Sequence, residues 1–253
     1  MPASGLVDIH CHMLPCVDDG AVDIKEAVRM LKMERDQGVR TIIVTPHYRK
    51  RMFETPAAEV KKQFRFLREI AWEYDESLRL YLGCEFHAEA DMVSLLRTGR
   101  VMSMAGSRYV LTEFSNRMDT FYIRERLYAL LSSGYKPIIA HAERYDCMRG
   151  NIDFVEELIS MGAYIQVNAD SLIGKEGFGT KRFCKTLMKH GAVHFVDSDS
   201  HGSRERISRL GEAYAYVENK FGRTCAEEIF VSNPHRILAD AKRRKRSFAA
   251  HKV

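Results

Sequence analysis

Short apolar runs rich in β-branched residues alternate along the chain with longer stretches in which apolar residues recur every three to four positions. The short runs are typical of buried strands, and the longer stretches are typical of amphipathic helices. Strand-like runs occupy residues 6–12, 39–47, 78–88, 109–115, 136–144, 163–170 and 192–202. Helical patterns occupy residues 23–38, 55–77 (with Thr55 as the expected N-cap), 92–97, 121–134, 152–162 and 180–191, and the chain beyond residue 202 is helical up to a basic tail.

This strict alternation predicts an α/β fold in which helical crossovers join the strands of a parallel sheet. Seven strand–helix units in succession favour a closed barrel, and a length of 253 residues suits one barrel-type domain. No linker or low-complexity tract divides the sequence. We therefore expect one domain over residues 1–253.

The composition fits a globular protein with a large core, since 45% of the residues are hydrophobic and 29% are charged. The formal net charge of +5, with a pI near 8.8, mildly favours anionic partners. Much of this positive charge lies in the tail at about residues 241–253. Such a run is typical of a solvated or frayed end, and binding to an anionic surface or to nucleic acid is the less favoured interpretation.

The cysteines show no spacing typical of a metal site or a redox motif. They are scattered as Cys11, Cys16, Cys84, Cys147, Cys184 and Cys225. The first residues contain no basic region leading into a long apolar run, and no apolar stretch reaches membrane-spanning length. These features predict a protein of the reducing cytoplasm with free thiols and no membrane span.

Histidines and carboxylates recur where the strand-like runs end. In a parallel barrel the loops that follow the strands converge on one mouth, so groups at these positions meet in space. His10 and His12 end the first run, and Asp199 and His201 end the seventh. The runs between them end, in chain order, at His47, Glu85, Glu113, His141, and the less informative Asn168 and Asp170.

The spacing of these groups predicts a metal centre. His10-x-His12 and Asp199-x-His201 each place two side chains on one face of a strand, because the pleat repeats every two residues. About nine nitrogen and oxygen donors are too many for one structural zinc, so we expect two or three divalent ions with Glu85 as a bridging carboxylate. Mixed imidazole and carboxylate ligands suit manganese, iron or zinc.

Two adjacent aspartates compete for one place in this site. Asp18 and Asp19 precede Gly20 and the first helical pattern, where either side chain can serve as a helix cap or as a metal ligand. We assign Asp19 to the metal site and keep Asp18 as its alternative.

Phosphoryl transfer suits a cluster of ions at a barrel mouth, because the ions stabilise both the attacking and the leaving oxygen. Guanidinium groups match the charge and shape of a phosphoryl group. Arg144 lies three residues past His141, and Arg206 lies five residues past His201. We therefore expect both arginines to bind phosphate or another anion at the metal site, with Arg204 as a weaker competitor.

Several stretches together resemble the bacterial polymerase-and-histidinol-phosphatase (PHP) superfamily: DIHCH, VDDG, TPH, GCEFH, HAERY, SDSH and NPHRIL. Within it they are most similar to the manganese-dependent tyrosine-protein phosphatases of capsule and exopolysaccharide loci. The similarity extends from about Val7 to Leu238. It implies a distorted, TIM-like (β/α)7 barrel with a trinuclear metal site, most often of Mn²⁺. It also implies dephosphorylation of a phosphotyrosine protein, typically a bacterial tyrosine kinase that controls polysaccharide export.

Carried over motif by motif, the resemblance assigns three sets of metal ligands and a phosphate site. The sets are His10, His12, Glu85 and Asp199 for one ion, Glu85, Glu113 and His141 for a second, and Asp19, His47 and His201 for a third. Arg144 and Arg206 would bind the phosphate, and with Asp199 and His201 they form the expected catalytic set. Ala142 stands where the family's motif usually has proline. Because proline would stiffen the loop that carries Arg144, the direction of the Arg144 side chain stays open.

The expected mechanism is direct attack of metal-bound hydroxide on phosphorus, without a covalent phosphoenzyme. Cysteine-dependent tyrosine phosphatases need an arginine six residues after the nucleophilic cysteine, and none of the six cysteines has one. The thiols are therefore interpreted as packing residues. The segment HYRKRMFETP is interpreted either as a substrate-access region, in which Met52 and Phe53 contact the phosphotyrosine ring, or as an ordinary solvated basic loop.

Other functions stay open at this stage. The same ligands would serve a small-molecule phosphatase of the histidinol-phosphate type or a nucleotide phosphodiesterase. An amidohydrolase also begins with H-x-H, but such enzymes often bridge their metals through a carboxylated lysine where this chain offers Glu85 and Glu113. A non-catalytic metal-binding regulatory domain is disfavoured because the ligand set is complete. Helical faces rich in Met, Tyr and Phe suit a homo-oligomer interface as well as a core.

Overall fold

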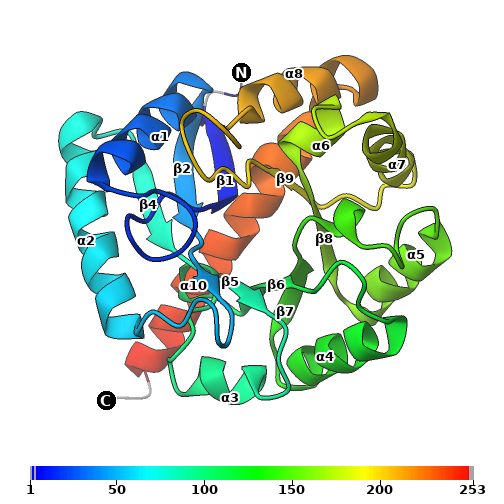
Figure 1. Cartoon of the computed structure of the whole chain (residues 1–253), viewed down its shortest axis with the longest axis horizontal. Helices are drawn as coiled ribbons and strands as arrows, with labels where there is room; N and C mark the ends of the chain where they lie inside the picture. The colour runs from blue at the N-terminus through cyan, green and yellow to red at the C-terminus, as the bar shows by residue number, and fades with distance from the viewer. Residues whose placement is uncertain (1, 3, 251–253) are drawn as a thin grey trace.

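The strands form a curled parallel sheet that closes into a distorted barrel (Figure 1). The computed structural model describes residues 2 and 4–250. Within them the strands are β1 (Leu6–Cys11), β2 (Val39–Val44), β3 (His47–Tyr48), β4 (Arg79–Leu82), β5 (Glu85–His87), β6 (Tyr109–Glu113), β7 (Lys136–Ile139), β8 (Tyr164–Asn168) and β9 (Phe195–Asp197). Strands β1, β2 and β4 pair in one sheet, and β3, β5, β6, β7, β8 and β9 pair in that order in another. Every pair is parallel, as the alternation of strands and helices predicts.

Two of the seven expected strands are interrupted, and these breaks distort the barrel. The run 39–47 divides into β2 and β3 at Pro46, and the run 78–88 divides into β4 and β5 at Gly83. Proline has no N–H to donate to a neighbouring strand. A Cβ at Gly83 would lie 2.8 Å from the sulfur of Met104 and 3.0 Å from a methyl group of Ile43, so a larger residue there would force these side chains to shift. The expectation of two unbroken strands was therefore wrong, although the seven strand positions are correct.

The barrel closes between its first and last strands at the carboxyl ends. The N–H of Asp199 donates to the carbonyl of His10 at 2.8 Å, and the N–H of His12 donates to the carbonyl of Ser200 at 2.8 Å. The register of β1 against β2 shifts within residues 8–11. Because such an irregularity re-aims the side chains around it, it helps to present His10 and His12 at the rim.

Helices cover the outside of the barrel (Figure 1). Asp23 and Asp119 cap two of them, each accepting a backbone N–H three residues on. Thr55 does not cap the second helix as expected, because its hydroxyl donates to the carbonyl of Val17.

No helix among residues 2 and 4–250 combines the length and the apolar character that crossing a bilayer requires. The helical elements are α1 (Ile24–Asp36), α2 (Ala57–Tyr74), α3 (Met92–Arg97), η1 (Met104–Gly106), α4 (Thr120–Ser132), η2 (Ala142–Arg144), α5 (Ile152–Met161), α6 (Ala169–Ile173), α7 (Phe178–Lys189), α8 (Leu210–Phe221), α9 (Arg223–Glu227), η3 (Glu228–Ser232) and α10 (Asn233–Ala250).

Apolar side chains fill the interior of the barrel. Val7 and Ile9 of β1 and Leu111 of β6 belong to this cluster, and Ile237 and Leu238 of α10 complete it. In Figure 1 α10 crosses behind the strands, so it covers the end of the barrel opposite the viewer. A larger cluster packs outer helices against the strands. With both faces of the sheet buried, polar side chains are accommodated mainly at the rim where the strands end.

The basic tail is helical in the part that the structure describes. Helix α10 includes residues 241–250, and residues 251–253 lie outside the described chain. Asp240 accepts a hydrogen bond from Nε of Arg108 at 3.0 Å and so anchors the helix to the barrel. The tail was expected to be a solvated or frayed end. Most basic side chains of residues 242–246 are exposed to solvent, as the first alternative predicts, and the described part of the tail is helical rather than frayed.

Candidate metal centre

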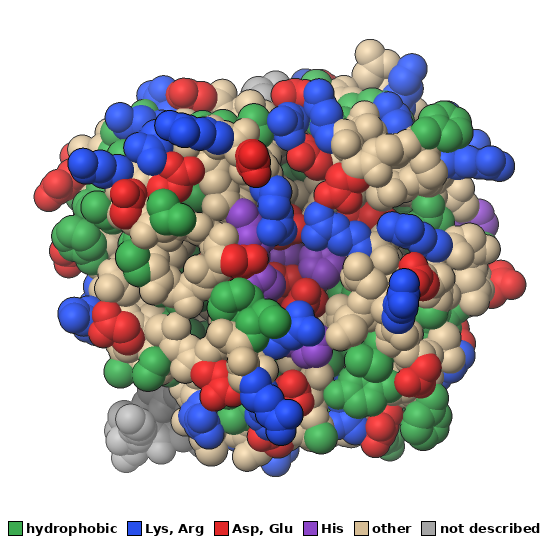
Figure 2. Space-filling view, in the orientation of Figure 1, with side chains coloured by type: hydrophobic (Ala, Val, Ile, Leu, Met, Phe, Trp, Pro, Cys, Tyr) green, Lys and Arg blue, Asp and Glu red, His purple; other side chains and the backbone are tan. Residues whose placement is uncertain are grey.

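A cavity of about 390 Å³ opens at the carboxyl ends of the strands. Figure 2 shows histidine side chains in a hollow on this face, with lysine and arginine side chains around the opening. Groups that are far apart in the sequence therefore meet at one rim. The residues that line the cavity are Asp19, His47, Arg49, Met52, Phe53, Glu85, Glu113, Asn116, His141, Arg144, Asp199 and Arg206.

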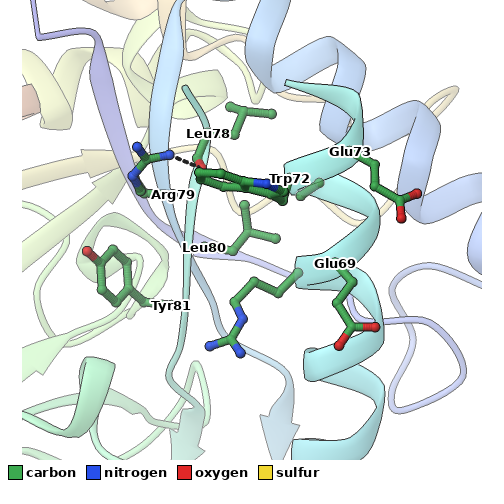
Figure 3. Close-up of a pocket in the computed structure, with 9 residues that line it drawn as sticks. Glu69, Trp72, Glu73, Leu78, Arg79, Leu80 and Tyr81 are labelled. Atoms are coloured by element: carbon green, nitrogen blue, oxygen red, sulfur yellow. Dashed lines mark hydrogen bonds between the residues drawn. The ribbon is translucent and has the colours of Figure 1, made fainter. Parts of the chain in front are cut away.

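A second cavity has nearly the same volume but a different chemistry. It lies between α2 and β4, measures about 380 Å³ and is lined in part by Leu78 and Leu80 (Figure 3). The indole of Trp72 lies beside it, with the guanidinium of Arg79 5.2 Å from the ring centroid. None of the described ligand candidates lines this cavity. The concentration of imidazole and carboxylate groups, rather than size, therefore distinguishes the first cavity.

Four buried side chains place one atom each around a common point. Nε2 of His10 lies 3.2 Å from Nε2 of His12, 3.1 Å from Oε2 of Glu85 and 3.4 Å from Oδ1 of Asp199. Nε2 of His12 lies 3.1 Å from the same Glu85 oxygen and 3.7 Å from the same Asp199 oxygen. Ligands about 2.1 Å from a tetrahedral ion are about 3.4 Å from one another. These separations therefore fit one divalent ion.

A second set of ligand atoms gathers around Asp19. Its Oδ1 lies 3.5 Å from Nε2 of His47 and 3.6 Å from Nε2 of His201. A nitrogen of His12 completes a set whose ligand atoms all lie within 4.8 Å of one another. The family resemblance implies the first three residues as one set, and His12 is an addition. Because the Asp19 side chain is 49% exposed, this set is open to the cavity.

Glu85 lies at the centre of the whole cluster. Its Oε1 is 2.8 Å from Nε2 of His141, and its Oε2 is 3.1 Å from Nδ1 of His47. Glu113 joins Glu85 and His47 in a third set of ligand atoms. His47 thus joins the two glutamates, while His141, which the family resemblance implies as the third member of this set, contacts Glu85 through its other oxygen. A carboxylate that faces imidazoles with both oxygens has the arrangement that a ligand shared by two ions requires.

Several of these buried atoms make no hydrogen bond among the described residues, although some lie within ion-pair distance of one another. They are Nδ1 of His47, Oε2 of Glu85, Oε2 of Glu113, Nδ1 of His141 and Nε2 of His201. A buried polar atom without a partner costs about 1–3 kcal/mol, so several in one cavity call for a ligand that satisfies them. Imidazole nitrogens and carboxylate oxygens together suit Mn²⁺, Fe²⁺ and Zn²⁺. The donor set therefore fits divalent ions.

Asp18 and Asp19 have different environments. Oδ2 of Asp18 accepts a hydrogen bond from Nδ1 of His12 at 2.8 Å and from the N–H of His47 at 2.9 Å. A carboxylate on the far nitrogen of a ligating histidine fixes its ring and leaves the near nitrogen free for the metal. Asp18 is therefore placed to orient His12, while Asp19 faces the cavity directly.

Two buried amides hydrogen-bond to the candidate ligands, and neither was predicted to be a site residue. Oε1 of Gln166 accepts the N–H of His141 at 2.6 Å and lies 3.3 Å from Nδ1 of His10. Nε2 of Gln166 donates to Asn168 at 2.9 Å, and Nδ2 of Asn168 donates to Oδ2 of Asp199 at 2.7 Å. The two amides alternate along β8, the same spacing that marks His10 and His12. That spacing was the available signal, because polar residues at alternate positions of an apolar strand share one face.

The cluster shifts the pKa values of its own members. Burial lowers the pKa of His10, but the carboxylates of Glu85 and Asp199 outweigh burial and raise this pKa to about 9. Burial raises the pKa of Glu113 to about 7, and the charge of Glu85 adds to this effect. Burial, assisted by the charge of His12, lowers the pKa of His201 to about 2. At neutral pH the imidazole of His201 is therefore uncharged, while that of His10 holds a proton that a bound ion would displace.

Arg144 and Arg206 reach the cluster through the same carboxylate. Nη1 of Arg144 donates to Oδ2 of Asp199 at 2.9 Å, and its Nη2 donates to Oε1 of Glu176 at 2.6 Å. Nη2 of Arg206 lies 3.3 Å from both oxygens of Asp199. Both arginines line the cavity, so each guanidinium faces the space available to an anion. The alanine at position 142 does not turn Arg144 away from the cluster.

Three of the site residues have strained backbones. His141, Asp199 and Arg206 have positive φ angles of 33°, 48° and 47°. Such conformations cost a non-glycine residue about 1–3 kcal/mol, and they concentrate at functional sites where the fold enforces them. Their occurrence at one rim supports a functional role for this part of the barrel.

The thiols do not belong to the site. Burial raises the pKa of Cys11, Cys84 and Cys184, so these side chains are protonated at neutral pH. Cys16 is exposed, but its sulfur contacts the carbonyl of Val22 at 3.1 Å and does not line the cavity. The described cysteines are therefore poorly suited to act as nucleophiles.

Known proteins share both the sequence and the fold. The family model for capsular polysaccharide synthesis, CpsB/CapC, matches residues 6–239. The tyrosine-protein phosphatase CpsB of Streptococcus pneumoniae is 37% identical over 240 residues, which cover 93% of this chain and 99% of that protein. The tyrosine-protein phosphatase YwqE of Bacillus subtilis is 33% identical over 217 residues, which cover 86% of this chain and 85% of that protein. A solved structure from a study of YwqE and CpsB as "unique metal-dependent tyrosine phosphatases" matches with a TM-score of 0.83 at 31% identity, over 94% of this chain and 93% of that one. The chain therefore belongs to the CpsB/CapC family of capsular polysaccharide synthesis proteins.

Proposed function

We propose that this protein is a metal-dependent protein-tyrosine phosphatase that holds two or three divalent ions at the rim of its barrel. The observation that carries the proposal is the set of unpartnered imidazole and carboxylate atoms around Glu85, beside two arginines on Asp199. The assignment of the ligands to this site is part of the proposal. The relatives named tyrosine-protein phosphatases support the substrate class.

The residues of the chain would divide the work as follows. Divalent ions supply Lewis acidity at the phosphoryl oxygens and activate water for attack. Asp199 holds Arg144 and Arg206 on one side of the cavity, where their guanidinium groups can clamp phosphoryl oxygens. Gln166 and Asn168 keep the ligand side chains in place through the hydrogen bonds described above.

Finer features of the proposal concern the metal, the substrate protein, the compartment and the domain organisation. Mixed imidazole and carboxylate ligation supports Mn²⁺, with iron or zinc as alternatives. The family's place in capsular polysaccharide synthesis supports a bacterial tyrosine kinase of that process as the phosphotyrosine protein. Six free cysteines support a reducing cytoplasm. We also infer that residues 1–253 form one domain.

A comparison of substrates tests the function. The Mn²⁺-loaded protein should release phosphate from a phosphotyrosine peptide with a higher kcat/KM than from histidinol phosphate or a nucleotide diester. Chelation should abolish the release and added Mn²⁺ should restore it, whereas alkylation of the thiols should leave it largely intact. Phosphate release that is lost on alkylation but retained on chelation would contradict the proposal. A higher kcat/KM for histidinol phosphate or the nucleotide diester would mean that the site hydrolyses that substrate instead.

A matched pair of arginine variants locates the activity in this cavity. Arg206→Ala should lower kcat/KM for the phosphotyrosine peptide by about 10²-fold, because it removes a charged donor that faces the developing negative charge. Arg204→Ala is the control, since Arg204 is exposed and does not line the cavity. Equal losses in the two variants would show that the loop's general charge, rather than the placed guanidinium, supports turnover.

A further inference from the structure

The wall of the metal cavity contains two apolar side chains. Met52 and Phe53 line it, whereas the other lining residues all carry charged, imidazole or amide groups. Metal ions and phosphate interact with polar atoms, so they give no reason for an apolar pair in this wall. In Figure 2 hydrophobic side chains border the hollow that holds the histidines. The apolar pair is therefore suited to a part of the ligand other than the phosphate.

These two residues belong to a tight turn that joins β3 to α2, residues 49–53. The N–H of Phe53 donates to the carbonyl of Arg49 at 2.8 Å, and the N–H of Arg49 donates to the carbonyl of Phe53 at 2.9 Å. Nζ of Lys50 donates to Oδ1 of Asp91 at 2.6 Å, which ties the turn to the segment before α3. The shape of the turn is thus set without a ligand, so little ordering entropy opposes binding.

The two apolar side chains lie at different depths. The ring of Phe53 stacks on the imidazole of His47, with centroids 5.2 Å apart and planes 8° apart. Because Nδ1 of His47 is 3.1 Å from Glu85, the Phe53 ring stands next to the metal cluster. Met52 is 60% exposed and so lies at the opening. When the phosphate of a ligand lies at the cluster, the rest of the ligand therefore extends past Phe53 and then Met52 toward the opening.

We propose that Met52 and Phe53 form the subsite for the phenyl ring of phosphotyrosine and make the site selective for aryl over alkyl phosphates. This inference rests on the proposed function, since it takes the phosphate to lie at the metal cluster. A phenyl ring gains contacts with an aromatic side chain and with a thioether sulfur. The single methylene of phosphoserine offers no ring for either contact.

Binding of two phosphonates separates the ring from the phosphate. Phenylphosphonate and methylphosphonate resist hydrolysis, so their dissociation constants for the Mn²⁺-loaded protein can be measured by titration calorimetry. Met52→Ala should raise the dissociation constant of phenylphosphonate by about fivefold, because the sulfur–aromatic contact is lost. The dissociation constant of methylphosphonate should change by less than twofold in the same variant. Phe53→Leu, checked for unchanged metal content because Phe53 contacts His47, should also reduce the preference for the phenyl ligand.

Phe66→Ala provides the matched control. Phe66 lies on α2, is 51% exposed and does not line the cavity, so its removal should leave both dissociation constants unchanged. Equal weakening of the two phosphonates by Met52→Ala, or no change in either, would overturn the ring subsite. If the wild-type protein prefers phenylphosphonate through Met52 but releases no phosphate from a phosphotyrosine peptide, the subsite stands and the proposed function fails.

Discussion

At the scale of single residues, two neighbouring aspartates have different surroundings that their sequence does not reveal. Asp18 is buried against Nδ1 of His12, while Asp19 is half exposed and faces His47 and His201. Both precede a glycine and a helix, so composition and spacing alone leave either one as the ligand. The distinction depends on which way each carboxylate points, and that is decided by the path of the loop.

Asp18→Asn should weaken Mn²⁺ binding by about 10–100-fold while the protein stays folded. The amide replaces a charged acceptor on Nδ1 of His12 with a weaker one, so the ring is less firmly oriented and less basic toward the metal. Titration calorimetry on the metal-free protein measures the change. Asp19→Asn is the companion variant, and it should reduce the number of ions bound because it removes a ligand rather than its support. Wild-type affinity in Asp18→Asn would show that the contact with His12 is not used.

At the scale of elements, the alternating pattern located the strands well and their interruptions poorly. A run of β-branched residues indicates that a segment is buried in a sheet. It does not show where the strand is interrupted, because residues around Pro46 and Gly83 are buried as well. The proline was a usable signal, since proline within a run argues against an unbroken strand. Gly83 was not, because its need for a small side chain comes from Met104, which is distant in the sequence. The helical conformation of residues 241–250 was not predicted, because a run of basic residues indicates exposure to solvent and does not show whether the backbone is helical.

The loop between β1 and α1 depends on one close approach. A Cβ at Gly20 would lie 2.0 Å from the carbonyl oxygen of His12 and 2.6 Å from its Cβ, so Gly20→Ala must displace the loop that presents His12. We expect this variant to lose about 1–3 kcal/mol of unfolding free energy and to bind Mn²⁺ more weakly. Urea unfolding and metal titration measure the two effects.

Gly179→Ala is the control for the same chemical change. Gly179 lies within α7 and a Cβ there would meet nothing within 4 Å, so alanine should be neutral or stabilise the helix by about 0.5–1 kcal/mol. Metal affinity should be unchanged. If Gly20→Ala behaves like Gly179→Ala, the loop is free to move and does not fix His12.

At the scale of the whole molecule, the gathering of candidate metal ligands at one rim was the most predictable feature. His10, His47, Glu85, His141 and Asp199 stand at strand ends, and a barrel brings all strand ends to one rim whatever the details of its helices. The supporting amides were not predictable to the same degree, because asparagine and glutamine occur in many buried roles. The division of ligands among separate ions was also beyond the sequence, since it depends on distances within the rim rather than on position along the chain.

The same cluster should make the stabilising effect of metal depend on pH. In the metal-free protein His10 has a pKa of about 9, above its ordinary value of 6.5, so its contribution to stability is present below pH 6.5 and is lost as the pH rises toward 9. Glu113 has a pKa of about 7, above its ordinary 4.5, so ionising it destabilises the metal-free fold as the pH rises from 4.5 toward 7. Both groups therefore weaken the metal-free protein between pH 6 and pH 8.

Ions bound at these candidate ligands should reverse this trend, because they would replace the protons on both groups. Each displaced proton can strengthen apparent affinity by up to about tenfold per pH unit, and tighter binding raises stability by mass action. The difference in Tm between Mn²⁺-loaded and chelated protein should thus be larger at pH 8 than at pH 6, as measured by calorimetric scans at both values. Glu113→Gln should flatten the dependence between pH 6 and pH 7, since it cannot release that proton. A Tm difference that shrinks with rising pH would mean that the ions do not bind at this protonated cluster.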